Sequence, residues 1–161
     1  LDMGIEPFLI ASTVNTIIGQ RLVRRVANRR DAYWSTPLET QMIKETVGHL
    51  LPKTKEEVAN VSADLGYKDL PLAGQTAYTL VKGRDTPATP HGYAGRAGIF
   101  EVMDVTEAIQ NLIVKRATSA EIQHKAIEQG MITMRQDGYL KALTGITTLE
   151  EVNRVTSADT A

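Results

Sequence analysis

Five arginines within ten residues are the side chains best suited to bind a ligand. A guanidinium presents a planar fork of N–H donors that matches the oxygens of a phosphate group. If this stretch is a strand, Arg21 and Arg25 share one face and Arg24 takes the other, so only a subset can meet one ligand. The alternative is a solvated face that meets a partner protein. The cluster consists of Arg21, Arg24, Arg25, Arg29 and Arg30.

A glycine-rich motif, GYAGRAG, follows at residues 92–98. Its glycines recur at every third residue, which differs from the G-x-G-x-x-G spacing of dinucleotide-binding proteins. The sequence contains no Gly-Lys-Ser or Gly-Lys-Thr, as a phosphate-binding P-loop requires. Within the motif, Arg96 is the residue with clear capacity to bind a ligand. The alternative interpretation is a structural turn that leads into a strand.

Other kinds of chemistry find little support. The sequence has no cysteine, which excludes disulfides, thiol catalysis and cysteine-ligated zinc. The histidines, His49, His91 and His124, lie far apart and lack metal-ligand spacing. A net charge of −1, from 18 basic and 19 acidic residues, argues against a dedicated nucleic-acid binder. Nucleic-acid binding through residues 21–30 remains a weaker alternative, which steeply salt-dependent DNA binding would favour.

The size of the chain limits the folds that could position these side chains. A sequence of 161 residues with 42% hydrophobic content suits one domain, or two small subdomains that share a core. No apolar run approaches the roughly 20 residues that cross a bilayer. We also expect no secretory signal, because the first residues include Asp2 and Glu6 and lack a basic leader.

Periodicity and local signals predict the elements. Residues 6–18 are expected to form a helix with Pro7 in its first turn, and the β-branched residues up to Val26 favour a strand after it. Thr36 and Glu39 have capping-box spacing and predict a helix to about Leu50. The other predicted elements are a helix over 54–65, a strand over 77–82, a glycine-rich turn over 92–98 and a strand over 97–104.

The last third of the sequence repeats one pattern: a threonine cap, a short helix and a glycine stop. Helices are predicted to begin after Thr106, Thr118, Thr133 and Thr147, the last three with capping-box sequences. This pattern predicts a small bundle of antiparallel or crossed helices. Together with the strands before it, it indicates an α/β (α+β) fold.

Several separated blocks resemble the bacterial secretion-traffic ATPases of type II secretion, type IV pilus assembly and competence systems. The first two follow the patterns G-[VI]-E-P-F-L-[IV]-A-S and Q-R-L-V-R-R, and the third follows G-Y-x-G-R-x-G-[IL]-[FY]-E. Near the C-terminus, E-G-M-x-[TS]-[LM]-x-x-D-G is matched with Gln129 in place of its first Glu, and G-x-T-[ST]-x-E-E-[VI]-x-R-V-T comes last. The blocks occupy residues 4–12, 20–25, 92–101, 129–138 and 145–156.

The resemblance implies the C-terminal portion of a RecA-like P-loop NTPase core. Residues 1–26 would end the core with a helix and a strand. Residues 27–91 would form an insertion that replaces the family's zinc-binding subdomain. Residues 92–161 would form the returning strand and a C-terminal helical subdomain.

The resemblance also implies a cytoplasmic hexamer, peripheral to the inner membrane, that uses ATP and Mg²⁺ to act on an inner-membrane platform protein. The family's P-loop, Walker B acid and histidine box lie upstream of Leu1. Without the phosphate cradle and the Mg²⁺ ligands, the present chain alone is expected to be catalytically inactive.

One departure from the family concerns metal. Many members bind zinc through two C-x-x-C pairs, and alignment on Arg25 and Gly92 places those four cysteines at positions where this sequence has none. We therefore expect no zinc, and packing must hold this region together. The four positions are Ala27, Arg30, Asp85 and Ala88.

The resemblance places three residues near the family's nucleotide pocket: Gln20, Arg21 and Arg96. They are the candidate nucleotide-binding residues, and no catalytic residue or metal ligand is expected in the chain. The alternative is that the two arginines pair with acids such as Glu6 or Glu101 and so fix the core strand.

A function of another class is also compatible with the sequence: a non-catalytic adaptor that docks on pilus or secretion machinery. The two hypotheses differ in what precedes Leu1 in the gene. An in-frame Gly-x-x-x-x-Gly-Lys-Ser/Thr would favour the motor. A nearby start codon without that motif would favour the adaptor.

Overall fold

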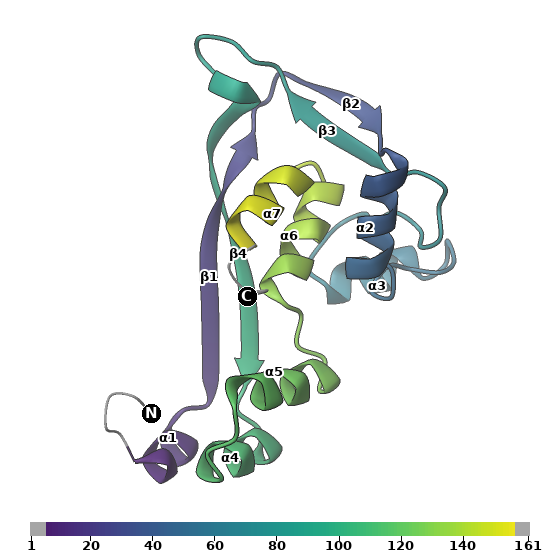
Figure 1. Ribbon diagram of the computed structural model, residues 1–161. Helices are drawn as coiled ribbons and strands as arrows, with labels where there is room; N and C mark the ends of the chain where they lie inside the picture. Colours follow the sequence, from purple (N-terminus) through teal and green to yellow (C-terminus); the bar gives the residue numbers. More distant parts are fainter. Residues whose placement is uncertain (1–5, 157–161) are drawn as a thin grey trace. The chain divides into compact units, whose positions relative to one another are not determined.

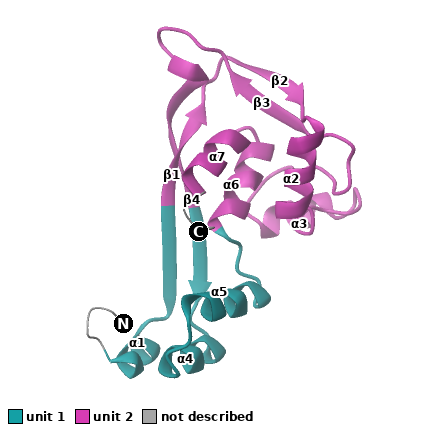
Figure 2. Ribbon diagram, in the orientation of Figure 1, with its two compact units in different colours: residues 1–20, 100–133 teal, residues 21–99, 134–161 magenta. Residues whose placement is uncertain are grey.

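The computed structural model describes residues 6–156, and the helices and strands are labelled in Figure 1. The chain forms two compact units, shown in Figure 2. The first comprises residues 1–20 and 100–133, and the second comprises residues 21–99 and 134–161. The strands β1 (Thr16–Val26) and β4 (Tyr93–Asp104) pair with each other, and a boundary between the units falls within each of them.

The first unit is built from three short helices and its parts of β1 and β4. The helices are α1 (Pro7–Thr13), α4 (Glu107–Val114) and α5 (Ser119–Glu128). Thr106 caps α4, and Thr118 forms a capping box with Glu121 at the start of α5, which confirms both predicted helix starts. The hydrophobic core cluster of this unit is formed by the buried residues Ala11, Val105, Ile109, Ile113 and Ala126.

The predicted helix over residues 6–18 was too long. Pro7 does occupy the first turn, but α1 ends at Thr13 and β1 begins at Thr16. The hydroxyls of Ser12 and Thr13 both donate to the carbonyl of Leu9, and such local bonds compete with continued helix. The β-branched residues that follow then favour the extended strand.

The second unit combines four helices with a small antiparallel sheet, and α6 (Met134–Leu143) packs against the sheet. In this sheet β2 (Arg30–Trp34) pairs with β3 (Thr79–Gly83), and Arg30 lies opposite Gly83. The helices are α2 (Pro37–Val47), α3 (Val58–Asp64), α6 (Met134–Leu143) and α7 (Leu149–Thr156), and a short 3₁₀ turn, η1, spans Pro90–Gly92. Their buried core is formed by Ile43, Val47, Leu51, Leu70, Tyr78, Leu80, Tyr139, Leu140, Ala142, Leu149 and Val152.

Two predicted helix starts in this unit had different outcomes. The capping box between Thr36 and Glu39 is confirmed, because each side chain bonds the backbone of the other. The helix predicted from Thr54 begins only at Val58. The carboxylate of Glu57 instead accepts hydrogen bonds from the N–H groups of Lys53 and Thr54, which fold residues 53–57 into turns.

The glycine-rich turn predicted over residues 92–98 is mostly strand. β4 begins at Tyr93, so Arg96 lies within the strand rather than in a turn. Gly92 and Gly95 have φ angles of 80° and 74°, which most side chains disfavour. Positive φ angles therefore occur at the start of β4, but they do not prevent its pairing with β1.

A glycine also sets how closely the last two helices of the second unit pack. A Cβ atom on Gly138 of α6 would lie 2.5 Å from a methyl group of Val152 in α7. Both residues are buried, so the two helices approach at a distance that only glycine permits.

The described residues combine seven α-helices with two two-stranded sheets, as expected for a mixed α and β fold. The helices of the last third do not all share one unit, because α4 and α5 lie in the first and α6 and α7 in the second. The three-segment division of the chain and its relation to a RecA-like core remain predictions. Within residues 6–156, every helix is too short or too polar to cross a lipid bilayer.

Candidate functional site

The arginines of the N-terminal cluster have different surroundings. Arg21 is half-buried in β1, and its guanidinium donates to the carbonyl of Val155 in α7. Arg30, at the start of β2, donates from Nη1 to the carbonyl of Gly145 at 2.6 Å. Both side chains therefore bond the backbone of the C-terminal segment, so they do not act as one ligand-binding set.

Arg24 makes the most extensive contact, and its partner is the carboxylate of Glu151 in α7. The backbone N–H of Arg24 lies 3.0 Å from Oε1, and its Nε and Nη2 lie 3.0 and 2.8 Å from Oε2. Arg154, one helical turn away, donates from Nε at 3.0 Å and from Nη2 at 2.7 Å. The Glu151 side chain is 0% exposed, so a buried carboxylate is held between two guanidinium groups.

Arg24, Glu151 and Arg154 form a charged cluster that we call the Arg24 centre. Its electrostatics keep Glu151 ionised. Burial by itself would raise the pKa of the carboxyl group. The hydrogen bonds from Arg154 and Arg24 outweigh that effect and lower the pKa of Glu151 to about 2. The same bonds raise the pKa of both arginines. The centre therefore carries fixed charges across the physiological pH range and is unsuited to proton transfer.

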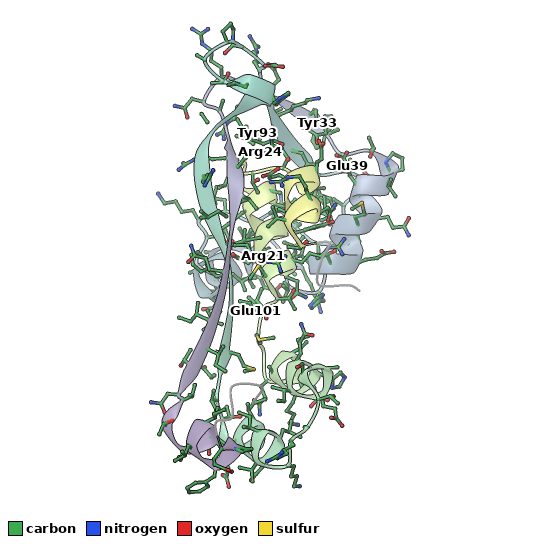
Figure 3. All side chains as sticks on the ribbon, turned by 60° about the vertical axis from the view of Figure 1, so that its left-hand side comes forward. Arg21, Arg24, Tyr33, Glu39, Tyr93 and Glu101 are labelled. Atoms are coloured by element: carbon green, nitrogen blue, oxygen red, sulfur yellow. The ribbon has the colours of Figure 1, made fainter. Side chains whose placement is uncertain are left out.

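An aromatic ring completes the centre. The guanidinium carbon of Arg24 lies 4.2 Å from the centroid of the Tyr93 ring, which is cation–π geometry. The Tyr93 hydroxyl is 2.8 Å from Oγ1 of Thr148, at the start of α7. Figure 3 shows Arg24 and Tyr93 close together, on β1 and β4. One arginine side chain thus joins two strands to the last helix.

The start of α7 explains why Glu151 is available to Arg24. The sequence predicted a capping box between Thr147 and Glu150, and this prediction was wrong by one residue. Thr148 provides the cap, because its hydroxyl accepts from the N–H of Glu151 at 3.2 Å. The Glu151 carboxylate does not return to the cap as in a capping box, but turns to Arg24.

The C-terminal segment also bonds the backbone of β1. Thr147 donates from its hydroxyl to the carbonyl of Arg24 at 2.8 Å, and the N–H of Val26 donates to the carbonyl of Ile146 at 2.9 Å. With the bond from Arg24 N–H to Glu151, three polar groups on one edge of β1 are paired with residues 146–151.

A polar cavity of about 840 Å³ lies beside the Arg24 centre in the second unit. At one side of it, Tyr33 donates a hydrogen bond to Glu39 at 3.0 Å, and Figure 3 labels both residues. Burial and this hydrogen bond raise the pKa of Tyr33 to about 12, so the phenol stays protonated. The lining mixes both signs of charge (Arg24, Lys82, Glu39, Asp85 and Glu150), which gives the cavity no clear preference for cations or anions.

The three candidate nucleotide-binding residues lie on the paired strands β1 and β4. Gln20 and Arg96 are exposed, and among the described residues their side chains make no hydrogen bond or ion pair. Arg21 bonds the carbonyl of Val155, as described above. Nucleotide binding by any of the three remains a prediction.

The two segments aligned with the C-x-x-C pairs of the resemblance, residues 27–30 and 85–88, lie side by side in this chain. The N–H of Ala27 donates to the carbonyl of Gly92 at 3.0 Å, and the N–H of Arg84 donates to the carbonyl of Arg29 at 2.9 Å. Within residues 6–156, no three His, Cys, Asp or Glu side chains cluster as metal ligands would. That the region binds no zinc remains a prediction.

One contact closes the loop around residues 85–88, and another joins that loop to the segment that follows residues 27–30. Gly83 and Gly92 touch through their backbones: a Cβ on Gly83 would lie 1.8 Å from the carbonyl oxygen of Gly92. Arg84 and Asp31 form an exposed ion pair with an Nη2–Oδ1 distance of 2.6 Å. The glycine contact is the stronger constraint, because exposed ion pairs contribute little to stability.

Sequence reasoning missed Glu151 and Tyr93 as members of the Arg24 centre. Glu151 looked like an ordinary helix-surface residue beside Glu150. The one local signal was Arg154 three residues later, which can pair with Glu151 along the helix. Nothing local indicated Arg24, which is 127 residues away in the chain.

Comparison with known proteins identifies the family. The sequence profile of the family described as Type II/IV secretion system protein matches residues 1–154. The chain therefore belongs to this family, as the sequence blocks had indicated.

Individual relatives are named for two machines. The chain is 34% identical to the type IV pilus assembly ATPase PilB of Myxococcus xanthus, over 99% of this chain and 24% of that protein. It is 35% identical to the type II secretion system protein E of Xanthomonas campestris, over 97% of this chain and 24% of that protein. It is 34% identical to the type II secretion system ATPase E of Vibrio cholerae, over 96% of this chain and 26% of that protein. The chain thus spans about a quarter of the length of these relatives.

Proposed function

We propose that this chain is the C-terminal part of a hexameric ATPase that powers type IV pilus assembly or type II protein secretion. The observation that carries the proposal is the family match over residues 1–154, together with relatives that are named as ATPases of these two machines. In the intact protein, ATP and Mg²⁺ would be the cofactors and an inner-membrane platform protein would be the partner. We place the protein in the cytoplasm, at the inner membrane.

The chain by itself would not hydrolyse ATP. Phosphoryl transfer needs a backbone cradle for the phosphates, a lysine and Mg²⁺ ligands. The 161 residues contain no Gly-Lys-Ser or Gly-Lys-Thr sequence. In this proposal the upstream part of the protein supplies that chemistry. Gln20, Arg21 and Arg96 would contact or sense the nucleotide, or brace the strands beside it.

The Arg24 centre would have a mechanical role in such a motor. Its bonds to Glu151 and its contact with Tyr93 join β1, β4 and α7 through fixed charges. A motor that transmits force through this part of the chain needs its last helix held against a core strand. The ion pair between Arg24 and the buried Glu151 would supply that connection, and its loss would uncouple hydrolysis from work.

The proposal can be tested with a chimera. The homologous quarter of the Myxococcus xanthus PilB protein would be replaced by this chain, and ATP hydrolysis and pilus assembly would be measured. We expect the chimera to hydrolyse ATP and the isolated chain to show no turnover. Arg96→Ala in the chimera should lower hydrolysis if Arg96 contacts nucleotide, and lower only the melting temperature if it braces the strand.

Two results would contradict the proposal. ATP turnover by the isolated chain would refute the division of chemistry between the two parts. The motor role would be refuted by a chimera that neither hydrolyses ATP nor assembles pili although it is correctly folded. Correct folding means that the chimera has the melting temperature and the hexameric state of the unmodified Myxococcus xanthus protein. An upstream gene sequence without a P-loop motif would favour the non-catalytic adaptor.

A further inference from the structure

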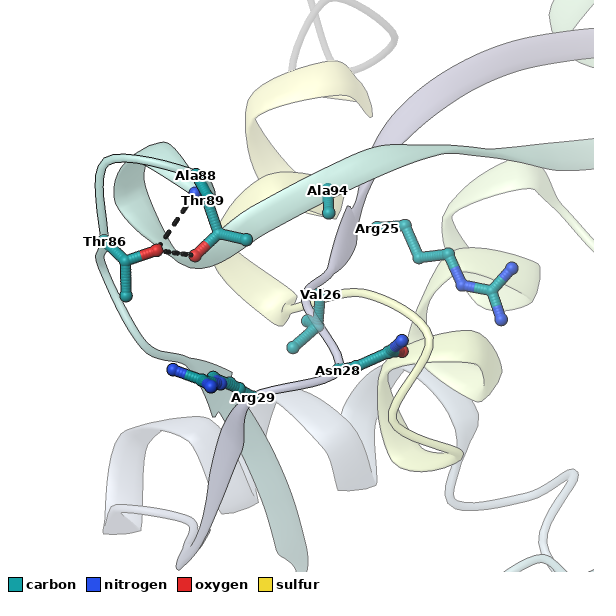
Figure 4. Close-up of a pocket in the computed structure, with 8 residues that line it drawn as sticks. All are labelled: Arg25, Val26, Asn28, Arg29, Thr86, Ala88, Thr89 and Ala94. Atoms are coloured by element: carbon teal, nitrogen blue, oxygen red, sulfur yellow. Dashed lines mark hydrogen bonds between the residues drawn. The ribbon is translucent and has the colours of Figure 1, made fainter.

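A second cavity, of about 490 Å³, lies in the second unit where the end of β1 meets the loop after β3. Figure 4 shows the residues that line it. Its charged lining residues are both arginines, Arg25 and Arg29, and the lining includes no carboxylate. The other lining residues are Val26, Asn28, Thr86, Ala88, Thr89 and Ala94.

The two arginines differ from the other arginines around them. Arg24 and Arg84 are paired with carboxylates, and Arg30 donates to a carbonyl. By contrast, within residues 6–156 the side chains of Arg25 and Arg29 make no hydrogen bond or ion pair. Two guanidinium groups without an ion-pair partner, in a cavity whose lining has no carboxylate, create a local positive potential.

The threonine hydroxyls of the cavity are already committed to each other. Oγ1 of Thr89 donates to the carbonyl of Arg84 at 2.9 Å, so in its 2.7 Å contact with Oγ1 of Thr86 the donor is Thr86. Oγ1 of Thr86 accepts in turn from the N–H of Thr89 at 3.1 Å. Both hydroxyl protons are therefore used within the loop. The side-chain donors left for a ligand are those of Arg25, Arg29 and the Asn28 amide.

The backbone around the cavity is held firmly. Arg84 donates its N–H to the carbonyl of Arg29, and Ala27 donates to the carbonyl of Gly92. The contact of Gly83 with Gly92 closes the base of the loop that carries the two threonines. A cavity whose walls are fixed in this way can bind a ligand without first ordering a loop.

We propose that this cavity is a binding site for a phosphate-class polyanion. In Figure 4 the side chain of Arg29 extends on the Thr86 side of the cavity, and that of Arg25 extends on the same side as Asn28. The donors therefore stand apart, and an elongated ligand with more than one anionic group fits them better than a single compact oxyanion. A soluble polyphosphate and a phospholipid headgroup share this chemistry. The site uses two arginines that the proposed motor function leaves unassigned.

Binding can be measured by titrating inorganic tripolyphosphate into the 161-residue chain at low salt, by isothermal calorimetry. We expect Arg25→Gln/Arg29→Gln to bind at least about tenfold more weakly, because each lost guanidinium removes charge-assisted hydrogen bonds. Lys115→Gln/Arg116→Gln, which removes two positive charges from exposed positions of the first unit, is the matched control and should bind as the natural chain does. Arg25→Lys/Arg29→Lys should be intermediate, since lysine keeps the charge and loses the planar fork.

A second arm distinguishes the source of the phosphate. The chain and the same variants would be sedimented with phosphatidylcholine vesicles that contain or lack phosphatidylglycerol. Tripolyphosphate binding that the double glutamine variant loses supports the site with a soluble ligand. Binding to phosphatidylglycerol vesicles alone, also lost in that variant, supports it with a lipid headgroup. If neither probe binds, or if the double variant with an unchanged melting temperature binds both equally well, the proposal is wrong.

Discussion

The backbone N–H and the guanidinium of Arg24 both donate to the carboxylate of Glu151, which lies 127 residues away in the chain and is fully shielded from solvent. Arg24 itself is 40% exposed. The buried partner is therefore the acid, whose charge depends entirely on its hydrogen-bond donors. Removing a donor leaves that charge uncompensated, which is far more costly than losing an exposed pair.

The stability of the second unit should depend on pH through Glu151. Its pKa falls from 4.5 to about 2 on folding, so its ionised form stabilises the fold above pH 4.5. This stabilisation is lost as the pH falls toward 2, and its full size is roughly 3 kcal/mol. Urea unfolding followed by near-UV circular dichroism, which reports the buried Tyr78 and Tyr139, should show the decline.

The variant Glu151→Gln is the control for this titration. It should be less stable at pH 7 and should show a flatter pH dependence between about pH 5 and pH 2. If the stability of the natural chain and that of Glu151→Gln change with pH in parallel, another carboxylate dominates acid unfolding.

The two arginines that hold Glu151 should contribute unequally. Arg24→Ala removes the two side-chain hydrogen bonds to the carboxylate, from Nε and Nη2, together with the cation–π contact to Tyr93, and leaves the backbone N–H bond in place. We expect a loss of about 3 kcal/mol. Arg154→Ala should cost less, about 2 kcal/mol, because it also removes two hydrogen bonds to the buried carboxylate but leaves the Arg24 bonds and the Tyr93 contact intact. Equal losses in chemical denaturation would contradict this ranking.

The packing of α6 against α7 should not tolerate a methyl group at Gly138. In Gly138→Ala the new Cβ would lie 2.5 Å from a methyl of the fully buried Val152, and we expect a loss of about 2 kcal/mol. The double variant Gly138→Ala/Val152→Ala tests the cause. If the clash is responsible, the alanine at 138 should cost much less when Val152 is already shortened; strictly additive losses would rule the clash out.

Metal removal should leave the fold unchanged. We expect no bound zinc by elemental analysis, and the same melting temperature with and without EDTA. The contact between Gly83 and Gly92 would hold the region instead. Gly92→Ala should therefore lower stability by about 3 kcal/mol, since it adds both a backbone clash and strain at a φ of 80°. Stoichiometric zinc, or a large fall in melting temperature with EDTA, would overturn the metal-free assignment.

The parts of the fold that depend on neighbouring residues were predictable. The capping boxes of Thr36 with Glu39 and of Thr118 with Glu121 formed as predicted, because both partners lie within one helical turn. The end of α1 was misplaced because the last residues of the predicted helix, Ile17 and Ile18, fit both helix and strand patterns. The pairing of β1 with β4, which decides between the two patterns, is a long-range interaction.

The candidate site was less predictable for a related reason. The arginine cluster was visible in the sequence, but the roles of its members depend on groups more than 100 residues away. Arg24 meets the Glu151 carboxylate, Arg30 meets the carbonyl of Gly145, and Arg25 meets neither. The cap of α7 is Thr148, one residue later than predicted, and the Glu151 carboxylate bonds Arg24, which no local pattern indicates.

The bonds between β1 and residues 146–151 have a consequence for how the protein behaves in a crowded solution. A strand with free N–H and C=O groups along one side is a template on which a strand of another molecule can pair and start aggregation. Around Arg24 and Val26 that side is already occupied by a hydroxyl, a carbonyl and a carboxylate from the C-terminal segment. Residues 146–151, which end the loop before α7 and begin that helix, thus protect β1 from unwanted pairing, and losing them would favour aggregation as well as loss of stability.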